Sequence, residues 1–103
     1  AHPGQWMRGA CQRLREGAPA GALAADLVAC DDYRDGLDAA RRVACPTVIV
    51  AGERDMMAPL KGARALAEAI AGAKLVVLKG AGHMMTVERP DETLDALRAL
   101  AAR

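Results

Sequence analysis

Apolar and charged positions alternate at helical spacing over the first part of the chain, residues 1–44. Trp6, Ala10 and Leu14 recur every fourth residue, and such spacing brings side chains to one face of a helix. The same kind of pattern predicts three helices, over residues 5–17, 21–30 and 33–43. We therefore expect an all-helical segment over residues 1–44.

The pattern changes at Pro46, because the residue before a proline is pushed towards an extended conformation. Residues 47–52, TVIVAG, and residues 74–78, KLVVL, are continuous runs of apolar, mostly β-branched side chains. Such runs are typical of strands in a parallel sheet that is buried on both faces. Leucine and alanine at helical spacing predict a helix after each strand, over residues 60–70 and 90–103. Residues 45–103 therefore predict a βαβα unit with two parallel strands, a fold of the α/β class.

Two polar residues follow the ends of these strands. Asp55 lies in the loop after TVIVAG, and His83 lies in the loop over 80–89, GAGHMMTVER. Ligands gather beyond the carboxyl ends of the strands in an open parallel sheet, so both loops belong to the edge where a site is expected. A carboxylate that accepts a bond from one imidazole nitrogen leaves the other nitrogen free to act as a general base. The sequence therefore predicts an Asp55–His83 acid–base pair.

Composition narrows the class of partner. The formal net charge is +1, and Trp6 and Tyr33 are the two aromatic residues, so neither a basic surface nor a stacking platform for nucleic acid is expected. No apolar run approaches the roughly 18 residues that span a bilayer, and the first residues lack the charged-then-apolar order of a signal peptide. We expect a cytoplasmic protein that binds neither nucleic acid nor membrane.

Cysteines give no sign of a disulfide framework or a metal site. Cys11, Cys30 and Cys45 are odd in number and lack CxxC spacing. They are expected to be reduced, mostly buried, small hydrophobic side chains.

Two stretches of the chain carry a family resemblance. GERDMMAP and GAGHMMTVERPDETLDAL, each after an apolar strand, closely resemble the C-terminal part of α/β-hydrolase-fold enzymes. The positions that match the motifs of that family are Gly52, Asp55, Pro59, Gly80, Gly82, His83, Glu88 and Pro90. Residues 1–44 resemble the end of a hydrolase cap, and residues 45–103 resemble the βαβα C-terminal part of the core. The resemblance thus implies a C-terminal fragment of the fold, with two parallel strands and flanking helices after a helical segment.

The resemblance also implies residue roles. Asp55 would be the acid of a catalytic triad and His83 its general base, in the acid-then-histidine order of the family. Glu53 is the rival acid, and the motif match favours Asp55. Met56 and Met84 are candidates for the wall of a substrate pocket, since methionine is a flexible apolar filler. Packing in the core is the competing interpretation for the four methionines that follow the acid and the histidine.

One departure from the family pattern limits the function. The family nucleophile usually stands in G-x-S-x-G, and this chain contains no serine. The sequence therefore predicts that the triad acid and histidine serve a nucleophile outside this chain, for hydrolysis of a small ester or related carbonyl substrate. The alternative is a non-catalytic association or folding module that keeps hydrolase features. The chain by itself is expected to be inactive.

No cofactor or metal is expected. GAGHMM lacks the third glycine of a dinucleotide loop, and His83 with Glu88 lacks the further ligands of a metal site. The expected partner is a small-molecule substrate. In addition, TVIVA would form an unpaired hydrophobic edge of the sheet, which predicts a homodimer or pairing with the missing N-terminal half of a hydrolase.

Overall fold

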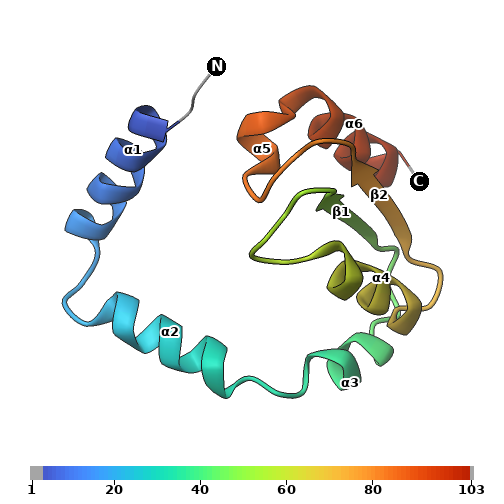
Figure 1. The fold of residues 1–103 in the computed structure, drawn as a ribbon. Coiled ribbons are helices and arrows are strands. Elements are labelled where there is room, and N and C mark those ends of the chain that lie inside the picture. The colour runs from blue at the N-terminus through green and yellow to red at the C-terminus, as the bar shows by residue number, and fades with distance from the viewer. Residues whose placement is uncertain (1–3, 103) are drawn as a thin grey trace. The chain divides into compact units, whose positions relative to one another are not determined.

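The structure, a computed structural model, describes residues 4–102 (Figure 1). Its elements in chain order are α1 (Gly4–Gly17), α2 (Ala22–Asp32), α3 (Gly36–Arg41), β1 (Val48–Gly52), α4 (Leu60–Ala69), β2 (Lys74–Leu78), α5 (Met85–Glu88) and α6 (Pro90–Ala101). The chain divides into two compact units between Arg34 and Asp35. Each unit is described by itself below.

The first unit contains α1 and α2, which agree with the helices predicted over residues 5–17 and 21–30. Neither helix buries a residue. Trp6, Leu14 and Leu27 are each more than half exposed, so the apolar stripes expected from the spacing face solvent within this unit.

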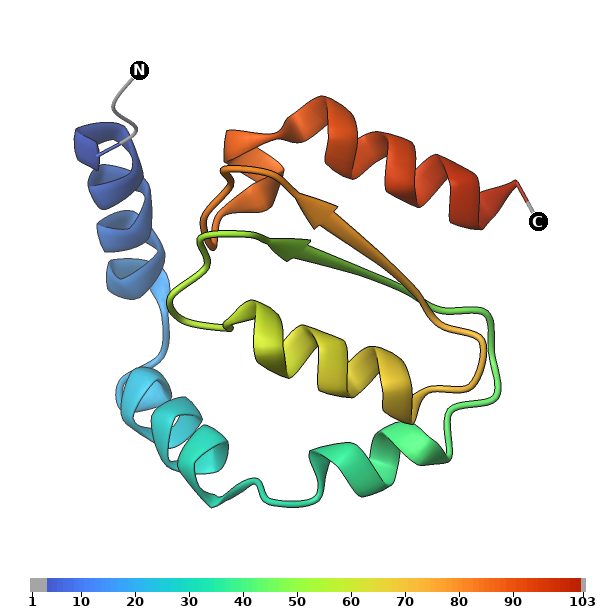
Figure 2. The ribbon, with the colours of Figure 1, turned by 45° about the vertical axis from the view of Figure 1, so that its right-hand side comes forward.

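The second unit is built on a two-stranded parallel sheet, as the sequence predicts. β1 pairs with β2 in a register that runs from Val48 opposite Lys74 to Gly52 opposite Leu78. α4 and α6 lie on opposite faces of the sheet (Figure 2), and α3 packs against α4. The α/β fold class, with two parallel strands and flanking helices, is therefore confirmed.

The expectation that both strands are fully buried is wrong. Ala51, Gly52 and Leu78, at the carboxyl ends, are buried, whereas Val48 to Val50 are half-buried and Val77 is exposed. The reason is that each strand of a two-stranded sheet has an unpaired edge. The buried apolar residues are Ala40, Ala51, Ile70, Leu78, Ala81 and Ala96. Three of them, Ala51, Leu78 and Ala81, lie at the carboxyl ends of the strands or in the loop that follows.

Residues 85–88 are helical, contrary to the loop expected over 80–89. The cap position of α5 is Met84, which has no side-chain acceptor to mark a helix start. Instead, the carboxylate of Glu88 accepts a hydrogen bond from the Met84 N–H at 3.1 Å. A glutamate carboxylate that accepts a hydrogen bond from the N-cap N–H is a known stabiliser of a first helical turn. The sequence has no polar residue at the cap position from which this helix could be predicted.

All three cysteines are free and exposed. The expectation that they are mostly buried is wrong, and their reduced state stays a prediction. Cys11 and Cys30 lie on the helices of the first unit, which bury no residue, and Cys45 lies in the segment before β1.

The units divide ten residues earlier than the boundary expected between residues 44 and 45, because α3 packs on α4 in the second unit. The division into a cap-like part (1–44) and a core part (45–103) stays a prediction. None of the helices within residues 4–102 is long and apolar enough to cross a membrane.

Candidate active site

Backbone hydrogen bonds hold the loops after β1 and β2 together. Beyond the paired strands, the Glu53 N–H donates to the Leu78 carbonyl at 3.1 Å, and the Arg54 N–H donates to the Ala81 carbonyl at 2.8 Å. Gly52 makes this approach possible, because a side chain there would lie 2.6 Å from the Ala81 oxygen and still closer to the Gly82 oxygen. Ala81 is 1% exposed. The loops that carry the predicted acid and histidine are therefore fixed to each other by main chain.

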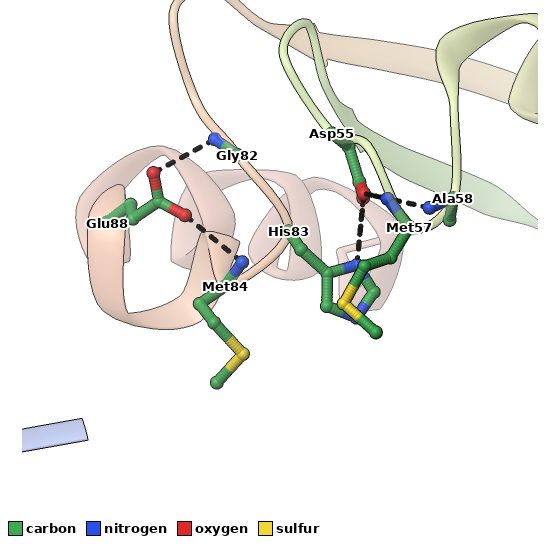
Figure 3. A network of polar contacts seen from close by, with 7 residues as sticks. All are labelled: Asp55, Met57, Ala58, Gly82, His83, Met84 and Glu88. Atoms are coloured by element: carbon green, nitrogen blue, oxygen red, sulfur yellow. Dashed lines mark hydrogen bonds and ion pairs between the residues drawn. The ribbon is translucent and has the colours of Figure 1, made fainter. Parts of the chain in front are cut away.

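Asp55 and His83 meet at this junction (Figure 3). Nδ1 of His83 lies 3.0 Å from Oδ2 and 3.2 Å from Oδ1 of Asp55. Among residues 4–102, Asp55 is the one polar or charged residue that is buried. The structure thus brings together the two residues that the sequence analysis singled out.

The Asp55 carboxylate is also held by its own loop. Oδ1 accepts hydrogen bonds from the Met57 N–H at 2.9 Å and from the Ala58 N–H at 2.8 Å. The bond from Ala58 is the largest cause that lowers the pKa of Asp55 below its ordinary value of 3.8, and the contacts with His83 and Met57 act in the same direction. Burial raises this pKa, and the hydrogen bonds outweigh it. Asp55 is consequently an ionised acceptor at neutral pH.

An ionised carboxylate fixes the roles of the two imidazole nitrogens. Because both Asp55 oxygens can only accept, Nδ1 of neutral His83 must carry the hydrogen and donate it. Nε2 then has a free lone pair. The His83 side chain is 43% exposed, against 2% for that of Asp55, and within the described residues the imidazole bonds to Asp55 alone. This arrangement can accept a proton at Nε2 while Asp55 stabilises the imidazolium that forms.

Glu88 is a residue of this site whose part the sequence did not reveal. Its Oε1 accepts a hydrogen bond from the Gly82 N–H at 2.9 Å, and its Oε2 accepts one from the Met84 N–H. These two donors stand on either side of His83 in the chain. The match of Glu88 to a family motif drew attention to the residue but not to these bonds.

An apolar cavity of about 290 Å³ adjoins the pair. Its walls come from β1, the start of α4, Met85 and the two polar residues themselves. Met56 and Met84, the predicted pocket residues, are not part of these walls; they are 89% and 41% exposed. Met57 is also exposed, at 78%.

Other candidates do not join the pair. Glu53, the rival acid, is exposed, and His83 bonds to Asp55 instead. The described residues contain no group of three His, Cys, Asp or Glu side chains that could hold a metal ion. His2 and its surroundings lie outside the described residues.

Comparisons with known proteins identify relatives of the chain. The sequence model of a family described as "Alpha/beta hydrolase family" matches residues 2–96. A search of curated proteins gave no match.

Three of the similar solved structures are described as an enol-lactonase, an esterase and a lactone-degrading enzyme. The enol-lactonase of Burkholderia xenovorans LB400 is 30% identical, with a TM-score of 0.65 over 70% of this chain and 27% of that one. A thermophilic esterase from Thermogutta terrifontis is 28% identical, with a TM-score of 0.64 over 69% and 26%. An enzyme described as degrading N-acyl homoserine lactones is 36% identical, with a TM-score of 0.58 over 61% and 24%. The chain therefore spans about a quarter of the length of the structures it matches.

Proposed function

Because this chain belongs to the alpha/beta hydrolase family, we propose that it supplies the acid and the histidine of a hydrolytic triad. Asp55 is the acid, His83 is the general base, and the nucleophile comes from outside the 103 residues. The observation that carries this proposal is the contact of 3.0 Å between His83 Nδ1 and Asp55 Oδ2. It stands at the carboxyl ends of two paired parallel strands, where sites of this fold class form.

The geometry supports a two-step acyl transfer. In the first step, Nε2 of His83 takes the proton of the nucleophile as that atom attacks the substrate carbonyl, and then gives the proton to the departing alkoxide. In the second step, Nε2 takes a proton from water as the water oxygen attacks the acyl carbon. It then gives that proton to the nucleophile as the bond between nucleophile and acyl group breaks, which releases the acid product and restores the nucleophile. Asp55 keeps the ring in one tautomer and stays ionised throughout.

The substrate proposed is a small ester, a lactone or a related carbonyl compound. Descriptions of the similar structures support this class, since they name an enol-lactonase, an esterase and a lactone-degrading enzyme. We further propose that Met56 and Met84 contact the hydrocarbon part of the substrate. Both side chains are exposed on the loops that carry the pair, and thioether side chains adapt to irregular apolar shapes.

The chain alone is expected to show no turnover, because it has no serine and His83 has no hydroxyl or thiol bonded to Nε2 within the described residues. The test is to express the chain together with the polypeptide encoded upstream of Ala1 and to measure hydrolysis of p-nitrophenyl acetate by the product. Asp55→Asn keeps the shape of the side chain but favours the wrong histidine tautomer, and we expect it to lower kcat about 10⁴-fold. His83→Ala should lower kcat at least as much.

The matched control is Asp95→Asn, the same chemical change on an exposed residue of α6. We expect it to leave kcat unchanged. If Asp55→Asn and His83→Ala both retained full activity, the triad assignment would be wrong. If the extended protein hydrolysed no ester, the alternative of a non-catalytic association or folding module would be favoured.

A further inference from the structure

Glu88 bridges the backbone on both sides of His83. One carboxylate oxygen accepts the Gly82 N–H at 2.9 Å, and the other accepts the Met84 N–H at 3.1 Å (Figure 3). Bonds from N–H groups to an ionised carboxylate are stronger than bonds between neutral groups. The residues immediately before and after the histidine are therefore tied to a single side chain.

Arg89, the next residue, holds the start of the same loop. Its Nη2 donates to the Lys79 carbonyl at 2.8 Å, and its Nη1 pairs with Glu92 at 3.2 Å. Gly80 adopts φ 75°, a left-handed conformation that favours glycine, and a side chain there would contact Arg89 at 3.4 Å. Glu88 and Arg89, which are consecutive, thus bond to the backbone of the histidine loop. Arg89 bonds at the start of the loop, and Glu88 bonds on either side of His83.

The backbone of Arg89 and of α5 is in turn bonded to the first turn of α6. The Thr93 hydroxyl lies 2.7 Å from the Arg89 carbonyl and 3.2 Å from the Met85 carbonyl, which joins α5 to the first turn of α6. A site supported from a regular helix is more rigid than one supported by loops alone. In the loop that carries Asp55, the backbone N–H of Arg54 donates a hydrogen bond to the Ala81 carbonyl. The backbone around His83 is therefore fixed from both sides.

We infer that Glu88 is a positioning residue for His83. It holds the backbone on either side of His83 so that Nδ1 points at Asp55 and Nε2 points outward. The catalytic consequence rests on the proposed function, but the orientation of the ring is a property of the chain itself and can be measured without activity.

The test measures the tautomer of His83 by long-range proton–nitrogen NMR on the full 103-residue chain, at a pH where the spectra show the neutral imidazole. The wild-type ring is expected to carry its hydrogen on Nδ1. In Glu88→Ala, which removes both acceptors, we expect a mixture with the Nε2–H tautomer. Amide exchange at Gly82 and Met84 should accelerate about tenfold or more, because their hydrogen bonds are lost.

Glu88→Gln is the second variant, in case Glu88→Ala fails to fold. Its amide keeps the size of the side chain but offers one oxygen acceptor in place of two, so an intermediate effect is expected. Glu68→Gln, on an exposed residue of α4, is the matched control and should behave as wild type.

Two outcomes would overturn the inference. One is that the Glu88 variants show the same His83 tautomer and the same amide exchange rates at Gly82 and Met84 as wild type. The other is faster exchange at Gly82 and Met84 with an unchanged His83 tautomer, which would reduce Glu88 to a local structural role. Failure of the proposed function is recognised separately, by full hydrolytic activity of Asp55→Asn and His83→Ala. In the active assembly, meaning this chain together with the part of a hydrolase that carries the nucleophile, Glu88→Gln is expected to lower kcat about tenfold and to leave KM unchanged, because a small misplacement of a reacting group slows the chemical step.

Discussion

At the scale of single residues, Asp55 has the most constrained surroundings in the site. A buried charge is tolerated only where partners replace the water it has lost, and here Met57, Ala58 and His83 all donate to its carboxylate. These same bonds orient the carboxylate towards the imidazole. Burial of Asp55 and orientation of His83 therefore have one structural cause.

The lowered pKa of Asp55 predicts a particular acid sensitivity. A carboxyl group whose pKa is lower in the folded state stabilises the fold above its ordinary pKa, and that contribution disappears as the pH falls through the folded value. We expect the free energy of unfolding to decrease as the pH drops below about 3.8. The measurement is urea unfolding, followed by circular dichroism, at a series of acidic pH values.

In this experiment Asp55→Asn should be less stable than wild type at neutral pH, and its stability should depend less on pH in the acidic range. Asp95→Asn, on the exposed surface of α6, should retain the wild-type dependence. Parallel pH profiles for wild type and Asp55→Asn would contradict the ionised, hydrogen-bonded state described for Asp55.

The sequence was sufficient to predict that Asp55 and His83 stand together, because both follow apolar strands and the ends of parallel strands share one edge of a sheet. It was not sufficient to predict the part played by Glu88. That part depends on where the side chain of a residue five positions after His83 returns in space, which requires the actual path of residues 82–88.

At the scale of elements, the site depends on how closely the two strand ends approach each other. The carbonyl groups of Ala81 and Gly82 occupy the space where a side chain at position 52 would stand. Backbone atoms held by hydrogen bonds, such as the Ala81 carbonyl that Arg54 contacts, cannot move aside as a flexible side chain can. Gly52 is therefore a packing requirement of the loop junction.

Gly52→Ala should lower the free energy of unfolding by about 1–3 kcal/mol, the usual range for overpacking. Thermal or urea unfolding measures the change. Gly62→Ala is the control: a methyl group there meets nothing within 4 Å, and alanine in the first turn of α4 should stabilise the helix by up to about 1 kcal/mol. Equal stability of Gly52→Ala and wild type would show that the loops yield easily at this point.

The helices and strands with a strong repeating pattern of apolar residues were predicted from the sequence. α5, which has no such pattern, was not. β1, β2, α4 and α6 follow long apolar runs or helical spacing. α5 contains four residues, begins at Met85 and has Met84, which offers no polar side chain, at its cap position. Its stability therefore comes from the Glu88 carboxylate and from packing on α6. Such tertiary support leaves no local signal in the sequence.

At the scale of the whole molecule, each of the two units, taken by itself, leaves apolar surface uncovered. Both helices of the first unit bury no residue, and the sheet of the second unit has one unpaired edge on each strand. An apolar strand with an open edge is a template for a further strand. These features support the proposal that the chain associates, either with a second copy or with the nucleophile-bearing part of a hydrolase.

We expect the isolated chain to sediment as a dimer or a larger species at micromolar concentration. Addition of the nucleophile-bearing part should replace this self-association with a defined complex. Sedimentation as a stable monomer over the whole concentration range would contradict the proposal.

The most direct test of the central claim is a double-mutant comparison of Asp55 and His83 in the active assembly, with kcat for p-nitrophenyl acetate as the readout. Residues that act as a unit show strongly non-additive effects. If Asp55 acts through His83, the variant that carries both Asp55→Asn and His83→Ala should be no slower than His83→Ala alone. A double variant slower by the product of the two single effects would mean that the residues act independently, and would contradict the acid–base pair.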